Sequence, residues 1–260
     1  MTKMSTGTYE WAAEVVNCVN GCEHDCRYCF ARYSAVDRYH RMTADEWRKP
    51  VVREADVNRG RKKIDGVVMF PSTHDITPAI LEPCMTVLAK LLAAGNEVLL
   101  VSKPHLECIE AIAKGFGDYK DTLRFRFTIG SSRDEVLKFW EPGAPSFEER
   151  RNSLKLAFDA GFKTSISAEP LLDPFYVREL WEGLIDYVNW EFWIGKLNKS
   201  ESRVKIDTLE AREKLQKIHM GQTDDNVMLI YERFKDEPLV RWKDSYKKVI
   251  TKFHPDTLLK

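Results

Sequence analysis

The chain has 260 residues, of which 43% are hydrophobic and 31% are charged, a composition typical of a globular protein with an ample core. Lysine plus arginine and aspartate plus glutamate number 40 each, so the formal net charge is zero and overall charge gives no support for nucleic-acid binding. No apolar run approaches the roughly 20 residues that span a bilayer, and the polar start lacks the apolar centre of a signal peptide. We therefore expect a cytoplasmic protein without a membrane span.

Six apolar runs, rich in β-branched and aromatic residues, alternate with stretches of helical pattern. We predict strands at residues 14–17, 67–70, 97–101, 124–129, 163–168 and 191–194. Helices are predicted between them, and Ser146 with Glu149 gives one of these helices a capping-box start. Repeated strand–helix units favour parallel strands, and six units curl into an open barrel, whereas eight would close it. The fold class is therefore α/β, a partial (β/α)6 TIM-like barrel.

The chain is expected to divide into a barrel core, residues 1–200, and a helical extension packed on it, residues 201–260. Within the extension, residues 206–219 have a helical pattern, and the Lys-rich end, residues 243–260, is predicted as a surface helix and tail. A short apolar run at residues 227–231 indicates an additional, weaker strand.

Three cysteines follow the first predicted strand with the spacing C-x3-C-x2-C, namely Cys22, Cys26 and Cys29. Thiolates at this spacing can bind three irons of a cubane [4Fe-4S] cluster and leave the fourth iron free. S-adenosylmethionine (SAM) can chelate such an iron, and an electron from the cluster then cleaves SAM to a 5'-deoxyadenosyl radical. The alternative is a zinc site that adds Cys18 or His24 as a fourth ligand. Cys18, Cys84 and Cys108 are otherwise expected to be buried thiols.

The sequence resembles the radical SAM superfamily, and within it the branch of spore photoproduct lyase and the DNA repair photolyase-like proteins. The resemblance rests on five segments: residues 17–32 (NCVNGCEHDCRYCFAR), 72–75 (STHD), 101–103 (VSK), 141–150 (EPGAPSFEER) and 168–170 (AEP). The cysteine motif is specific to the superfamily, and the later segments support the branch.

The resemblance and the position of residues after predicted strands together suggest a set of cofactor-binding and catalytic side chains. Lys103 is expected to pair with the SAM carboxylate, and Tyr28 to pack its ring near SAM. The remaining expected contacts to SAM or substrate are Ser72 and Thr73 for the SAM amino group, Thr128 and Ser131 for its ribose or carboxylate, and Asp75 and Glu169 as catalytic groups. Glu141 and Arg150 are expected to form a structural pair.

The resemblance implies a radical SAM enzyme acting on a nucleobase or nucleotide. Ser72 stands where that branch has a hydrogen-donating cysteine, and a serine O–H bond is too strong for this role. Two alternatives remain open: a radical SAM enzyme that modifies a small metabolite or protein side chain, and a non-catalytic iron–sulfur binding module. The sequence has no second cluster or flavin motif, so a flavodoxin or ferredoxin is expected to donate electrons.

Overall fold

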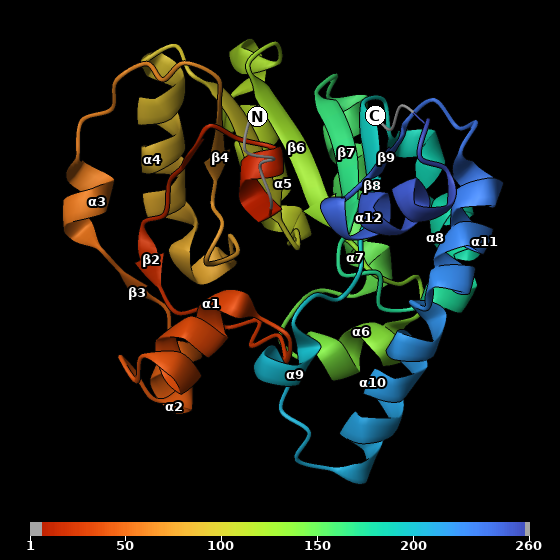
Figure 1. Ribbon diagram of the computed structural model, residues 1–260. Coiled ribbons are helices and arrows are strands. Elements are labelled where there is room, and N and C mark those ends of the chain that lie inside the picture. The colour runs from red at the N-terminus through yellow and green to blue at the C-terminus, as the bar shows by residue number, and fades with distance from the viewer. Residues whose placement is uncertain (1–6, 258–260) are drawn as a thin grey trace.

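The computed structural model describes residues 7–257, and its centre is one sheet of parallel strands. Strands that are neighbours in the sheet follow one another along the chain, and the first and last strands of the described residues do not pair with each other. The sheet is therefore an open, partial TIM-like barrel (Figure 1). Its strands are β1 (Glu14–Val15), β4 (Val67–Phe70), β5 (Glu97–Ser102), β6 (Leu123–Thr128), β7 (Lys163–Ala168), β8 (Glu191–Ile194) and β9 (Val240–Trp242).

Helices connect consecutive strands, as parallel pairing requires. The connecting helices are α4 (Leu81–Ala93), α5 (Leu106–Gly115), α6 (Asp134–Trp140), α7 (Phe147–Asp159), α8 (Val177–Leu184), α9 (Ser200–Arg203), α10 (Leu209–Gly221) and α11 (Asp224–Phe234). The long connection from β1 to β4 holds an antiparallel strand pair and short helices: β2 (Val19–Asn20), α1 (Phe30–Arg32), a π-helix (Tyr33–Arg38), α2 (Ala44–Trp47), β3 (Val51–Val52) and α3 (Glu54–Asn58).

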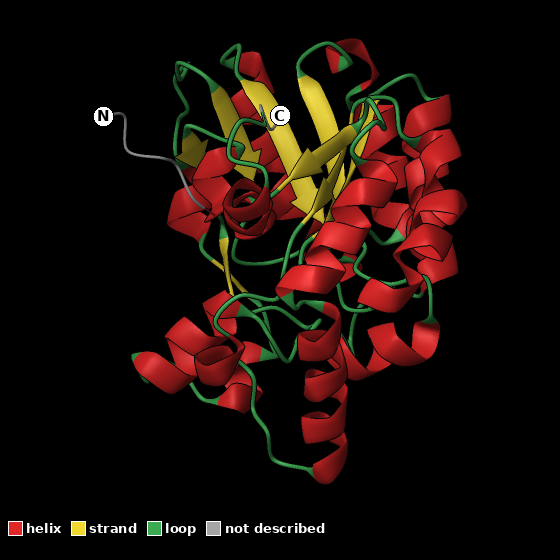
Figure 2. Ribbon diagram, turned by 45° about the vertical axis from the view of Figure 1, so that its right-hand side comes forward, coloured by secondary structure: helices red, strands yellow, loops and turns green. Residues whose placement is uncertain are grey.

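Four short 3-10 helices lie inside the connections, at Pro78–Ile80, Gly117–Tyr119, Pro174–Tyr176 and Ile185–Tyr187, and a fifth, Gly7–Glu10, precedes β1. The chain ends with α12 (Asp244–Phe253). Figure 2 shows the strand arrows pointing toward the lower part of the molecule, where Figure 1 places α1, α2 and α9. Within residues 7–257, no helix combines the length and apolarity that crossing a membrane demands.

The predicted strands are confirmed at all six positions, three of them with the predicted ends and three with ends that shift by one or two residues. The strand predicted at residues 227–231 is wrong, because these residues lie in α11. Thr223 caps this helix by accepting a hydrogen bond from the Asn226 amide, and its buried side chains recur at helical spacing: Val227, Ile230, Tyr231 and Phe234. The additional strand is β9, which extends the sheet beside β8.

Side chains of the strands alternate between two apolar layers. Val68 and Phe70 of β4 pack with the helices in the main core cluster, whereas Met69 packs inside the barrel with Leu99 of β5 and the partly buried Trp11. Both faces of the strands are therefore covered, as in other parallel sheets. The carboxyl ends of the strands carry the candidate site.

A close approach between two loops holds the cysteine segment against the end of α6. The Gly143 amide donates to the His24 carbonyl at 3.1 Å, and a Cβ placed on Gly143 would lie 2.2 Å from the Glu23 carbonyl oxygen. A real Cβ does not approach backbone that closely, so this contact requires glycine.

We predict that Gly143→Ala lowers the free energy of unfolding by about 1–3 kcal/mol, because the added methyl forces the two loops apart. Urea unfolding followed by circular dichroism measures the change. Gly117→Ala is the matched control, since nothing lies within 4 Å of its Cβ position. Equal stability of the Gly143→Ala variant and the native chain would contradict the close approach.

Candidate active site

A cavity of about 470 Å³ lies at the carboxyl ends of the strands. Its wall combines strand ends, the cysteine segment and the N-terminal residues Gly7 to Trp11. Among the residues that line it are all but one of the predicted site residues: Cys22, Cys26, Tyr28, Cys29, Ser72, Thr73, Asp75, Lys103, Thr128 and Glu169. The fold thus brings together side chains that are up to 147 residues apart in sequence.

All three cysteines of the motif line this cavity. Cys22 and Cys26 are buried, and Cys29 is half-buried at the start of α1, where its Sγ accepts from the Arg32 amide at 3.4 Å. Burial raises the pKa of the Cys22 thiol to about 12 and raises the pKa values of Cys26 and Cys29 as well. Three cysteines that line one cavity fit a [4Fe-4S] cluster with three protein ligands, which they would hold at the cavity wall.

Cys18, the fourth cysteine of the segment, lies elsewhere. Its Sγ is 3.9 Å from the Sγ of Cys84, and both thiols are fully buried in the main core. Cys108 belongs to the same cluster. The structure therefore gives no support to a zinc site with Cys18 as ligand, and the expectation of three buried core thiols is confirmed.

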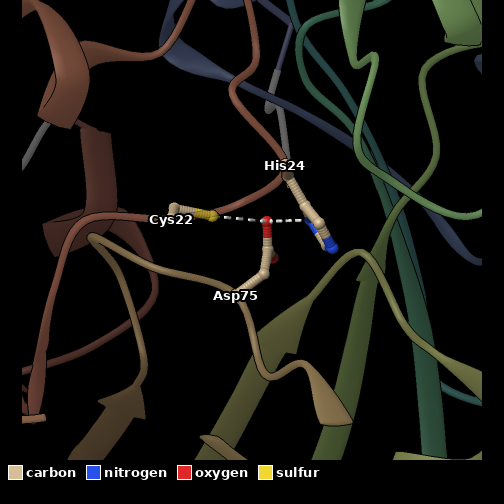
Figure 3. A group of neighbouring side chains, drawn as sticks. All are labelled: Cys22, His24 and Asp75. Atoms are coloured by element: carbon tan, nitrogen blue, oxygen red, sulfur yellow. Dashed lines mark hydrogen bonds and ion pairs between the residues drawn. The ribbon is translucent and has the colours of Figure 1, made fainter. Parts of the chain in front are cut away.

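His24 points toward Asp75, as does the thiol of Cys22 (Figure 3). The His24 Nδ1 atom lies 2.8 Å from Asp75 Oδ2, and its Nε2 atom lies 2.9 Å from Nε2 of His105. Both ring nitrogens are thus engaged within the protein. This arrangement favours a supporting role for His24, because a zinc ligand would need one nitrogen free.

Asp75 accepts hydrogen bonds from several donors. Its Oδ1 atom accepts from the Ser102 hydroxyl at 3.1 Å and from the Lys103 amide at 2.8 Å, and its Oδ2 atom lies 3.5 Å from Lys103 Nζ. Burial alone would raise the pKa of the Asp75 carboxyl, but the charges of Lys103 and His24 and the hydrogen bonds hold it well below its usual value. Asp75 is therefore an ionised group whose lone pairs are occupied.

Lys103 follows β5 and is 9% exposed in the cavity wall. Its ammonium lies 5.9 Å from the centre of the Tyr28 ring. Burial alone would lower the pKa of Lys103, but the neighbouring Asp75 carboxylate raises it well above its usual value. The cavity therefore presents one firmly charged ammonium close to the cysteines.

Asn17 fixes the loop after β4, a role that no pattern in the sequence predicts. Its side-chain oxygen accepts from the amides of Ser72 and Thr73 at 2.8 and 2.9 Å, and its side-chain nitrogen donates to the Ser72 hydroxyl at 3.1 Å. Asn17 directly precedes the cysteine segment, so the two loops are joined at this point. Its place at the start of the quoted motif was the only signal in the sequence.

The expected pair of Glu141 and Arg150 is confirmed, with Arg150 Nη1 2.5 Å from Glu141 Oε2 and both side chains fully buried. The Tyr28 hydroxyl donates to the same carboxylate. Arg150 also donates to the Thr128 carbonyl at 3.2 Å. The pair thus fixes the Tyr28 ring relative to the end of β6, which the sequence pattern did not indicate.

Glu169, at the end of β7, forms an ion pair with a lysine far along the chain. Lys243 Nζ lies 3.3 Å from Glu169 Oε2 and 2.8 Å from Glu10 Oε1, and it donates to the Gly7 carbonyl at 3.0 Å. Its ammonium is also 4.0 Å from the centre of the Trp11 ring. Lys243 is 1% exposed, although it opens a Lys-rich segment predicted to lie at the surface.

The two hydroxyl residues near the end of β6 differ in position. Thr128 lines the cavity. Ser131 is 1% exposed and does not line it, and its hydroxyl oxygen accepts from the Arg133 amide at 3.1 Å. Ser131 therefore organises the turn into α6.

The comparisons with known proteins agree with this architecture. A model of the radical SAM superfamily matches residues 16–188. An uncharacterized protein, ORF301 of Acidianus two-tailed virus, is 25% identical over 185 residues, which is 65% of this chain and 58% of the viral protein. Its name gives no function.

Solved structures share the fold at low sequence identity. A cysteine-to-serine mutant of spore photoproduct lyase has a TM-score of 0.57 at 16% identity over 93% of this chain and 79% of the lyase chain. SuiB of Streptococcus suis bound to SAM has a TM-score of 0.52 at 11% identity over 89% of this chain and 50% of that chain.

The chain spans 58% of the viral protein and 62% of a spore photoproduct lyase chain determined with AdoMet and a dinucleoside spore photoproduct. The superfamily model, in contrast, matches well over half of the chain and includes the cysteine segment and the strands from β2 to β7. The open parallel barrel with three thiols at its cavity is thus that of a known family, and the chain belongs to the radical SAM superfamily, whose members use a [4Fe-4S] cluster and SAM.

Proposed function

We propose that this chain is a radical SAM enzyme that holds its [4Fe-4S] cluster on Cys22, Cys26 and Cys29. The observation that carries the proposal is that these three cysteines and Lys103 line one cavity. The bound cluster and SAM would supply a 5'-deoxyadenosyl radical by reductive cleavage. The side chains around the cluster would bind SAM, orient it and enclose it in the cavity.

Each residue near the thiols is assigned to a particular chemical group of SAM. Lys103 pairs with the SAM carboxylate as a point charge, and Asp75 orients that ammonium instead of reacting itself, since its oxygens are already occupied. The amino group of SAM is assigned to the loop of Ser72 and Thr73, and its ribose to Thr128. Tyr28 supplies a fixed ring near SAM.

The proposed substrate is a nucleobase or nucleotide. Aromatic side chains that line the cavity support this class, because every base can stack on an aromatic ring: Tyr9, Trp11 and Phe30. Glu169 lines the same cavity, and burial raises the pKa of its carboxyl, which suits a group that bonds a sugar hydroxyl or substrate N–H.

The return of a hydrogen atom to the product must differ from that in spore photoproduct lyase. Ser72 takes the place of the hydrogen-donating cysteine, and across residues 7–257 the thiols that line the cavity are the three proposed ligands. The donor is therefore proposed to be something other than a cysteine thiol of this chain. Since the remaining cysteines are buried singly or as the Cys18–Cys84 pair, electrons are proposed to come from a flavodoxin or ferredoxin.

Reductive cleavage of SAM tests the proposed function. Anaerobically reconstituted protein, reduced with dithionite, is expected to release 5'-deoxyadenosine, measured by mass spectrometry. Single-stranded DNA, RNA or nucleotides should stimulate release. Cleavage that none of them stimulates would contradict the substrate class, and absence of cleavage would favour a non-catalytic binding module.

Replacing any one of Cys22, Cys26 or Cys29 with alanine is expected to abolish SAM cleavage, because a cluster without one thiolate loses both stability and the correct free corner. Iron content and the visible absorption of the cluster measure the loss. Cys18→Ala is the matched control, since its thiol packs against Cys84, and it should keep its iron. Normal iron content and cleavage in any of the three variants would exclude that residue as a ligand.

Lys103→Gln is expected to weaken SAM binding by about 10- to 100-fold, because it removes a charge-assisted hydrogen bond to the carboxylate. Equilibrium dialysis of cluster-loaded protein with radiolabelled SAM measures this affinity. Lys114→Gln, on the exposed face of α5, serves as control. An unchanged dissociation constant in Lys103→Gln would refute the assigned role.

A further inference from the structure

The charged side chains that line the cavity are paired with opposite charges, with one exception among the described residues. Asp75 is paired with Lys103, and Glu169 with Lys243. Asp25 lies 3.0 Å from Arg32, and Lys196 lies 3.9 Å from Asp224. The guanidinium of Arg203, in contrast, makes no hydrogen bond or ion pair with any residue in 7–257.

Arg203 ends the short helix α9 after β8, and its position is well defined. Ser200, at the start of this helix, is buried, and its Oγ atom lies 2.8 Å from Nε2 of His219 in α10. Val204, directly after it, is 6% exposed and packs in an apolar cluster with Leu197 and Trp140. Buried neighbours on both sides thus hold the half-buried Arg203 at the cavity.

The surroundings of Arg203 identify what it faces. Its guanidinium carbon lies 5.9 Å from the centre of the Phe30 ring, and Phe30 is 41% exposed beside the cavity. The Arg203 charge also acts on Glu169 across the cavity wall, but Glu169 already has Lys243 at 3.3 Å. The positive charge of Arg203 therefore has no ion-pair partner within residues 7–257.

We propose that Arg203 is the anchor for a phosphate group of the substrate. A planar guanidinium suits bidentate binding of phosphate oxygens, and the adjoining Phe30 ring provides a face for a base or sugar. This inference rests on the proposed function, because it places the substrate in the same cavity as SAM.

The experiment compares ligands that differ only by phosphate. Isothermal titration calorimetry is carried out anaerobically on cluster-loaded protein saturated with SAM and not reduced. The probes are uridine and uridine 5'-monophosphate, ribose and ribose 5-phosphate, and a ten-nucleotide single strand. The first two pairs report a phosphate on a small molecule, and the strand reports phosphates within a nucleic acid.

The phosphorylated member of each pair is expected to bind more tightly than its unphosphorylated partner, or the strand more tightly than uridine. Arg203→Gln should reduce the affinity for the phosphorylated probe by about 10- to 100-fold. Arg203→Lys should recover only part of it, because lysine cannot form the bidentate contact. Arg212→Gln, an exposed arginine of α10 that does not line the cavity, is the matched control and should bind like the native chain.

Equal binding of phosphorylated and unphosphorylated probes would overturn the proposal, as would a phosphate preference that persists in Arg203→Gln. Loss of SAM affinity in Arg203→Gln without a phosphate preference in the native chain would also overturn it, and would assign Arg203 to SAM. These outcomes are independent of the proposed function, since reductive cleavage of SAM is measured separately. Arg203-dependent phosphate binding in a protein that cannot cleave SAM would leave the subsite standing and refute the enzyme.

Discussion

The carboxylate of Asp75 joins its own loop after β4 to two other segments of the site, the cysteine segment and the end of β5. It lies within hydrogen-bond distance of the His24 ring in the cysteine segment. It also accepts hydrogen bonds from the Ser102 hydroxyl at the end of β5 and from the amide and ammonium of Lys103. Removing one partner of such a buried ion pair costs about 3–5 kcal/mol, because a charge is left without compensation. The relative positions of the thiols and of the ammonium proposed to bind SAM therefore depend on this one group.

A second buried charge plays the corresponding role on the other side of the cavity. Lys243 joins Glu10 near the N-terminus to Glu169 at the end of β7, and it lies next to β9, the last strand of the open barrel. The residues before β1 thereby become part of the cavity wall. Because the lysine neutralises Glu169, Arg203 keeps a free charge in the region proposed for the substrate.

Local patterns in the sequence predicted the strands, the cysteine motif and ten of the residues that line the cavity, because these depend on periodicity and on the position after a strand. They could not predict partners that only tertiary contacts supply. Lys243 lies in a Lys-rich segment that resembles any solvated helix, and the roles of Asn17 and His24 depend on loops 50 or more residues away. The error at residues 227–231 has the same origin, since a short apolar run has no periodicity to separate a strand from a buried helix face.

The central claim is that three thiolates bind a cluster whose fourth iron is open to SAM. Electron paramagnetic resonance of the dithionite-reduced, anaerobically purified protein tests it most directly. We predict the signal of a reduced [4Fe-4S] cluster, with g-values that shift when SAM is added. A signal that SAM leaves unchanged, or a protein that contains one tetrahedral zinc in place of iron, would contradict it.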